Sequence, residues 1–111
     1  MRNINSLKND EFRLIYNKGK SYGNKYLVMY VIKNDNSSDI KLGISVSKKV
    51  GNSVIRHRVT RLIRESYRLN KEKLIGGISI IVIGRGSAKD KGYKEIESAF
   101  MHLAKLHNIL A

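Results

Sequence analysis

The sequence of 111 residues contains no cysteine, no proline and no tryptophan. The absence of cysteine excludes disulfide scaffolds, thiolate catalysis and cysteine-ligated zinc or iron–sulfur sites. Long apolar runs are also missing, since the longest uncharged one, Tyr26 to Ile32, is far shorter than the roughly 20 residues that cross a bilayer. The first twenty residues hold no apolar segment typical of a signal peptide, so we expect a cytoplasmic protein.

Acidic residues are scarce. Nine Asp and Glu stand against 22 Lys and Arg, which gives a formal net charge of +13. Neither a DxD pair nor an HExxH motif occurs, so we expect no metal-binding catalytic centre in the protein. Hydrophobic residues make up 41% of the chain, enough for one core, and the length predicts a single domain over residues 1–111. The charge indicates a polyanionic partner, with nucleic acid favoured over an acidic membrane.

Periodicity and turn residues predict six main elements. They are helices at Asn9–Lys18, Asn52–Lys71 and Lys91–Leu110, and strands at Tyr26–Ile32, Ile40–Ser47 and Ile78–Ile83. A further short strand would fit near Ser21–Tyr22. The polar stretch Asn34–Asp39 predicts a turn, and the strands on either side of it are expected to pair as a hairpin. The order predicts an α+β or α/β sandwich of one sheet with helices.

The middle helix concentrates the arginines. Five of the eight in the chain fall within 13 residues: Arg56, Arg58, Arg61, Arg64 and Arg68. At about 100° per residue, one side of the helix carries most of them, and the other is expected to pack on the sheet through Ile55, Val59, Leu62, Ser66 and Leu69.

Two observations favour a nucleic-acid contact for this helix. Only Glu65 interrupts the basic side, so its charges repel one another unless a polyanion is present. The side also uses arginine, whose planar fork suits phosphates, although lysine outnumbers arginine by 14 to 8 in the chain. Two alternatives remain: a solvated helix face, and a salt bridge from Arg61 or Arg64 to Glu65.

The string GISVSKKVGNSVIRHRVTRLIRES, from Gly43 to Ser66, closely resembles the bacterial ribonuclease P protein component, whose signature is G-x-S-V-S-K-K-x-G-N-A-V-x-R-N-R-x-K-R-x-x-R. The similarity extends to Glu11–Tyr30 and to Ile80–Ala88. His57 and Thr60 depart from the signature, which has Asn and Lys there, and Gly84 and Gly86 replace the usual Ala and Pro.

The resemblance implies a fold like the second domain of ribosomal protein S5, with a small mixed sheet, about three helices and a left-handed β-α-β crossover. It also implies the function of an endoribonuclease subunit that helps to remove the 5′ leader from precursor tRNA. The RNA subunit would carry out the hydrolysis with Mg²⁺, so the protein would hold no catalytic or metal-binding residue. Its partners would be the catalytic RNA and precursor tRNA, and not DNA, a membrane or a small-molecule substrate.

Two binding surfaces follow from the resemblance. The catalytic RNA would contact the middle helix and the residues before it: Lys48, Lys49, Asn52, Arg56, His57, Arg58, Arg61, Arg64 and Arg68. Asn52 could equally be a simple helix N-cap. The leader would lie in a cleft between the first helix and one sheet face, formed by Phe12, Tyr16, Val28 and Tyr30, with Ser45 and Ser47 as weaker candidates. Without the resemblance, Phe12 and Tyr16 would be taken as core residues.

The sequence is compatible with two other classes of function. A stand-alone RNA-binding or ribosomal module would use the same basic helix without processing any RNA. A protein-only ribonuclease would need a pair of histidines such as His57 and His102. The third histidine, His107, is five residues beyond His102, and both are expected at the surface or half-buried.

Overall fold

The structure is a computed structural model that describes residues 5–34 and 37–111. Its helices are α1 (Asn9–Lys18), α2 (Ser53–Asn70) and α3 (Tyr93–Leu106). The strands are β1 (Asn5–Ser6), β2 (Lys20–Gly23), β3 (Leu27–Lys33), β4 (Ile40–Val46) and β5 (Ile78–Gly84). Two short 3₁₀ turns follow α2 and β5, at Lys71–Lys73 and Gly86–Ala88. None of the described helices is long and apolar enough to span a membrane.

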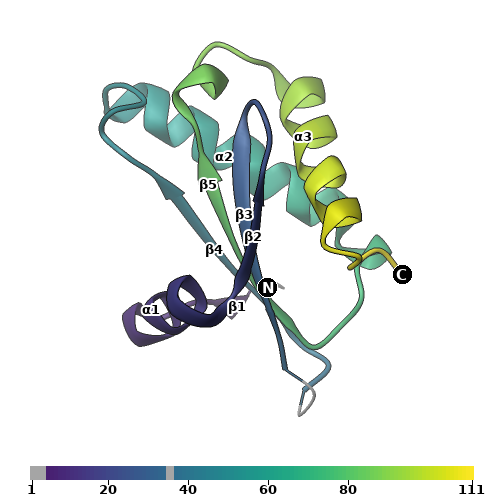
Figure 1. Ribbon diagram of the computed structural model, residues 1–111. Coiled ribbons are helices and arrows are strands. Elements are labelled where there is room, and N and C mark those ends of the chain that lie inside the picture. Colours follow the sequence, from purple (N-terminus) through teal and green to yellow (C-terminus); the bar gives the residue numbers. More distant parts are fainter. Residues whose placement is uncertain (1–4, 35–36) are drawn as a thin grey trace.

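The five strands form one mixed sheet in the order β1-β4-β5-β3-β2. β4 pairs in parallel with β1 and β5, whereas β3 is antiparallel to both β5 and β2. α1 covers one face of the sheet, and α2 and α3 cover the other (Figure 1). In that view β4 and β5 point upward, β5 lies to the right of β4, and α2 connects them behind the sheet, which is a left-handed crossover. The predicted α+β fold is confirmed.

The predicted hairpin is wrong. β5 lies between β3 and β4 and pairs with both along its whole length. The reason is the composition of β5, in which Ile78, Ile80, Ile81 and Val82 are all at most 1% exposed. An almost wholly apolar strand is most stable in the middle of a sheet, where both faces and both edges are covered. Residues 35–36 of the predicted turn lie outside the described residues.

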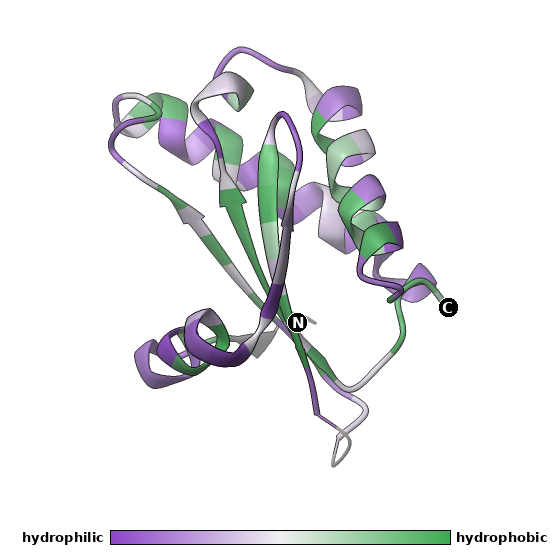
Figure 2. Ribbon diagram, viewed as in Figure 1, coloured by the Kyte–Doolittle hydropathy of each residue, from purple (hydrophilic) through white to green (hydrophobic). Residues whose placement is uncertain are grey.

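The predicted buried side of α2 is right for four of its five residues, since Val59 and Ser66 are buried and Ile55 and Leu62 are partly buried against the core. Val59, Ile63 and Tyr67 are fully or almost fully buried, whereas Leu69, expected to pack on the sheet, is 56% exposed. The cause is α3, which packs along α2 and covers the flank that holds Tyr67 and Asn70. Figure 2 shows that hydrophobic and hydrophilic residues alternate along both α2 and α3. The opposite, basic side of α2 remains at the surface.

The last helix ends earlier than predicted, at Leu106, and the chain then turns through Asn108, whose φ is 59°. This turn carries the C-cap residue His107 into the interior, where it is 9% exposed, so the expectation of a surface or half-buried position is wrong for this histidine. Its Nε2 lies 2.8 Å from the carbonyl oxygen of Met29, and its ring meets that of Tyr22 edge-on at 4.7 Å. Burial lowers the pKa of His107 below its usual 6.5.

The lowered pKa of His107 predicts a loss of stability in weak acid. Below pH 6.5 the unfolded chain binds a proton that the folded chain does not, so the free energy of unfolding decreases as the pH falls toward the folded pKa. Urea denaturation between pH 7.5 and 5 measures it. His107→Gln can still donate to Met29 but does not titrate, so its stability should depend less on pH. Equal pH dependence in both proteins would contradict this assignment.

Candidate nucleic-acid interface

α1 is fixed across its sheet face by one buried residue and one ion pair. Ile15 is 1% exposed and anchors the helix on the sheet. Glu11 Oε2 lies 2.7 Å from Lys41 Nζ on β4, and this hydrogen bond lowers the pKa of the Glu11 carboxyl. The helix therefore holds Phe12 and Tyr16 at defined positions above the strands.

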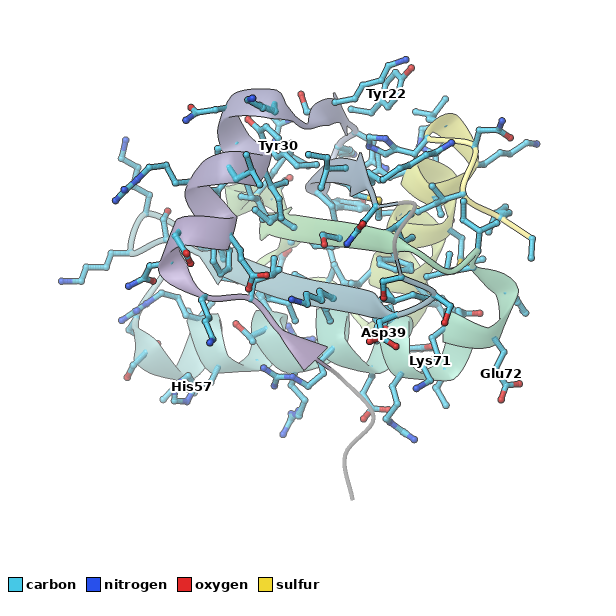
Figure 3. All side chains as sticks on the ribbon, turned by 90° about the horizontal axis from the view of Figure 1, so that it is seen from below. Tyr22, Tyr30, Asp39, His57, Lys71 and Glu72 are labelled. Atoms are coloured by element: carbon cyan, nitrogen blue, oxygen red, sulfur yellow. The ribbon has the colours of Figure 1, made fainter. Side chains whose placement is uncertain are left out.

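Phe12 and Tyr16 join Tyr30 of β3 in one aromatic cluster. A Cβ atom on Gly43 of β4 would stand 2.4 Å from Phe12 Cζ, so only glycine lets the ring lie this close to the strand. The ring centroids of Phe12 and Tyr16 are 6.1 Å apart, and those of Tyr16 and Tyr30 are 5.0 Å apart in an edge-to-face arrangement. Figure 3 shows Tyr30 beside α1.

Strand register continues this cluster across the sheet. Ser45 is opposite Ile83, Ile83 is opposite Val28, and Val28 is opposite Gly23, so these four residues form one row beside the row of Tyr30. Ser45, Ile83 and Val28 are partly exposed. We call the whole surface the aromatic face: Phe12, Tyr16, Tyr30, Val28, Ile83 and Ser45. Ile83 was missed by sequence reasoning, since its contribution depends on how β5 pairs.

The structure brings together five of the six predicted leader-binding residues on the aromatic face. The sixth, Ser47, follows the end of β4 and is exposed. Its carbonyl accepts a hydrogen bond from the amide of Val50 at 3.0 Å, within the turn that leads into α2. Ser47 therefore lies between the aromatic face and the basic helix rather than on a strand.

The basic side of α2 has the predicted exposure. His57, Arg61, Arg64 and Arg68 are exposed, and a surface hollow is lined by His57, Thr60, Arg61 and Arg64 among others. The two departures from the family motif, His57 and Thr60, thus lie beside two of its arginines. Lys48 and Lys49 are exposed in the turn before the helix. Asn52 is the N-cap, and its side chain accepts a hydrogen bond from the amide of Ile55 at 3.0 Å.

Three of the five arginines already have acceptors within the protein. Arg56 Nε donates to the carbonyl of Gly51 at 3.2 Å. Arg68 pairs with Glu65 at 2.7 Å on the surface. Because Glu65 pairs with Arg68, the alternative of a salt bridge from Arg61 or Arg64 to Glu65 is wrong. Within the described residues, Arg61 and Arg64 make no ion pair. They are the most available cations of the helix.

Arg58 has a structural role. Its guanidinium donates to the carbonyl oxygens of Lys89 and Lys91 and so ties α2 to the loop before α3. Hydrogen bonds from a charged donor are the stronger kind.

We predict that Arg58→Ala decreases the free energy of unfolding by about 1–2 kcal/mol, because it leaves two loop carbonyls without their charged donor. Urea denaturation measures this loss, and Arg58→Lys serves as the charge-matched control. Arg58→Ala should change the salt dependence of RNA binding less than Arg61→Ala does. A change in salt dependence as large as that of Arg61→Ala, with unchanged stability, would show that Arg58 contacts phosphate instead.

The histidines do not form a nuclease pair. His57 lines the hollow on α2, whereas His102 lines a different hollow between the β2–β3 turn and α3. In the described part of the chain, no three His, Asp or Glu side chains converge as ligands for a metal ion.

Known proteins resemble this chain over nearly its whole length. Residues 1–107 match the family model described as Ribonuclease P. The ribonuclease P protein component of Lachnoclostridium phytofermentans is 60% identical over 107 residues, which cover 96% of this chain and 91% of that protein.

Two solved structures have the same fold. The RNase P protein of Staphylococcus aureus has a TM-score of 0.87 at 37% identity, with 96% of this chain and 97% of that chain covered. The RNase P protein of Thermotoga maritima has a TM-score of 0.82 at 30% identity, with 91% and 96% covered. The match of sequence and fold over nearly the whole length shows that this chain belongs to the ribonuclease P protein family.

Proposed function

We propose that this chain is the protein subunit of ribonuclease P, the ribonucleoprotein that removes the 5′ leader from precursor tRNA. One observation supports the proposal most strongly. The chain carries two separate surfaces suited to RNA: the aromatic face, which includes Ser45 near the end of β4, and the basic helix α2, which begins after the turn that follows β4. A protein that holds one RNA against another needs two such surfaces.

The basic helix would bind the catalytic RNA. Arg61 and Arg64 are exposed on it, and a guanidinium can hold a phosphate through two parallel hydrogen bonds. Lys48 and Lys49 would extend the contact as simple positive charges. Arg68 would have to break its ion pair with Glu65 before it could bind a phosphate, so we assign Arg68 a smaller contribution to the affinity for RNA.

The aromatic face would bind the leader. Single-stranded RNA exposes the flat faces of its bases, which stack on aromatic side chains irrespective of sequence. Tyr16 is 39% exposed, and Tyr30 meets it edge-on, so a base can lie against this pair. Ser45 at the end of the row would donate a hydrogen bond to a leader phosphate. Mature tRNA lacks a leader, so this surface would favour the precursor.

Hydrolysis would belong to the RNA subunit. In the described residues no three His, Asp or Glu side chains come together as ligands for a metal ion. We therefore assign Mg²⁺ to the RNA. The protein would contribute binding of the leader and positioning of the precursor, which act on affinity rather than on bond cleavage.

Cleavage assays test this proposal. Precursor tRNA is incubated with protein alone, with catalytic RNA alone at low Mg²⁺, and with both. We expect cleavage only where the RNA is present and a clear increase when the protein is added. Cleavage by protein alone would indicate a protein enzyme, and the absence of stimulation would indicate an RNA-binding module without a processing role.

A further inference from the structure

A third candidate surface lies apart from the two already described. A hollow of about 470 Å³ opens between the β2–β3 turn and α3. Its size is in the range of roughly 300–1,000 Å³ common for ligand sites. Its lining includes Asn24, Lys25, Tyr26, Lys94, Glu95 and His102, none of which belongs to the basic helix or the aromatic face. We call it the Tyr26 hollow.

Cations surround the aromatic ring in this hollow. Lys25 Nζ lies 5.7 Å and Lys91 Nζ 5.8 Å from the centroid of the Tyr26 ring, and Lys94 also lines the hollow. Among the described residues of the lining, the one acid is Glu95, whose Oε1 accepts the amide hydrogen of Gly92 at the start of α3. The hollow thus combines a π-face with an excess of positive charge.

The walls of the hollow are fixed before any ligand arrives. Asn24 Nδ2 donates to the carbonyl of Ala99 on α3 at 3.0 Å. Arg85 Nη1 donates to the carbonyl of Asn24 at 3.0 Å, and the Ser87 hydroxyl donates to the carbonyl of Lys25. The first bond holds the turn against α3 and the other two hold it against the segment after β5, which reduces the conformational entropy that binding would otherwise cost.

We propose that the Tyr26 hollow binds one unpaired RNA nucleotide. Its phosphate would draw the ammonium groups of Lys25 and Lys91 from the Tyr26 ring toward itself and toward Lys94, and its base would then lie against the ring. The site offers one group for each part of a nucleotide: the aromatic ring can stack on the base, and the ammonium groups attract the phosphate. His102 adds a donor. Its Nδ1 lies 3.1 Å from Asn24 Nδ2, so in the neutral ring Nε2 carries the proton.

The position of the hollow suggests where the nucleotide comes from. Gly23 ends the row of the aromatic face, and a Cβ built there would lie 3.8 Å from Arg85 Nη1, the atom that also contacts Asn24. A leader strand that crosses the row would therefore reach the hollow past Arg85. An unpaired nucleotide of the catalytic RNA has the same chemistry and is the second source. Both sources rest on the proposed function, whereas binding of the nucleotide itself does not.

The first test uses the full chain and a ten-residue oligouridylate. Removing the three cations in Lys25→Gln/Lys91→Gln/Lys94→Gln should weaken binding roughly tenfold more than the charge-matched control Lys18→Gln/Lys33→Gln/Lys105→Gln. A decamer that contains 4-thiouridine should photo-crosslink to the peptide with Tyr26. Equal weakening by both triple variants, or crosslinks confined to the aromatic face and α2, would overturn the proposal.

The second test identifies the source in the reconstituted holoenzyme. If the leader enters the hollow, the triple variant should lose affinity for precursor with a long leader and not for precursor with a two-nucleotide leader. If the catalytic RNA enters, the variant should bind that RNA more weakly, with the same loss for every leader length. Normal behaviour in both assays would overturn the proposal. A wild-type protein that fails to stimulate the RNA would instead contradict the proposed function.

Discussion

Replacing Tyr16 and Tyr30 together by alanine should remove most of the preference of the holoenzyme for precursor over mature tRNA. The two rings meet at 5.0 Å on the aromatic face, so the double substitution eliminates the surface on which a leader base would stack. Stacking of one base contributes about 1–3 kcal/mol, so we expect the preference to fall between about 5-fold and about 150-fold. Affinity for mature tRNA should stay the same because it carries no leader.

Equilibrium binding of both RNAs to the reconstituted holoenzyme measures this effect. Tyr16→Phe/Tyr30→Phe is the matched control, since it keeps both rings and should keep the preference. Tyr30 is half-buried, so thermal melting of each variant must accompany the binding data. If a folded variant lost affinity for precursor and mature tRNA equally, the assignment of leader binding to the aromatic face would be wrong.

The second large effect is expected at the basic helix. Arg61→Ala/Arg64→Ala should weaken binding of the catalytic RNA by about 100-fold at physiological salt, because each arginine gives up charge-assisted hydrogen bonds to phosphate. The log–log slope of affinity against salt should decrease by about two, since each phosphate contact releases about one counterion. Filter binding over a range of salt concentrations provides both numbers.

A charge-preserving variant separates charge from geometry. Arg61→Lys/Arg64→Lys keeps both positive charges and should keep the slope, while it loses part of the affinity that depends on the planar fork. If the slope of log affinity against log salt concentration were unchanged in Arg61→Ala/Arg64→Ala, the basic side of α2 would be a solvated surface that does not contact RNA phosphates. That is the alternative to an RNA contact that the sequence leaves open.

Local patterns in the sequence were sufficient for most of the helices and strands, but not for β1, for the bounds of α3 or for how the strands pair. The ranges of α1, β4 and β5 follow from periodicity and turn residues within each segment. The hairpin between β3 and β4 was wrong because pairing is decided by which strand must be buried on every side. The exposure of Leu69 has a similar origin, since it depends on where α3 packs.

The same limit applies to the candidate site. The exposure of Arg61 and Arg64 follows from helical spacing alone. Arg58, however, finds its acceptors 31 and 33 residues away in the chain, and His107 contacts Met29 at a separation of 78 residues. Spacing along the sequence cannot reveal partners at such separations. The Tyr26 hollow was missed for this reason too, because the β2–β3 turn and α3 meet only in the folded protein.

The central place of β5 also matters during synthesis. β3 and β4 are synthesised before β5. Each of them therefore has one unpaired edge until residues 78–84 have left the ribosome. Ile83, a member of the aromatic face, belongs to this segment that is synthesised late. A nascent chain that stops short of β5 would expose two open strand edges and would offer no finished leader surface. Ribosomal pausing before Ile78 should therefore favour aggregation rather than premature capture of RNA.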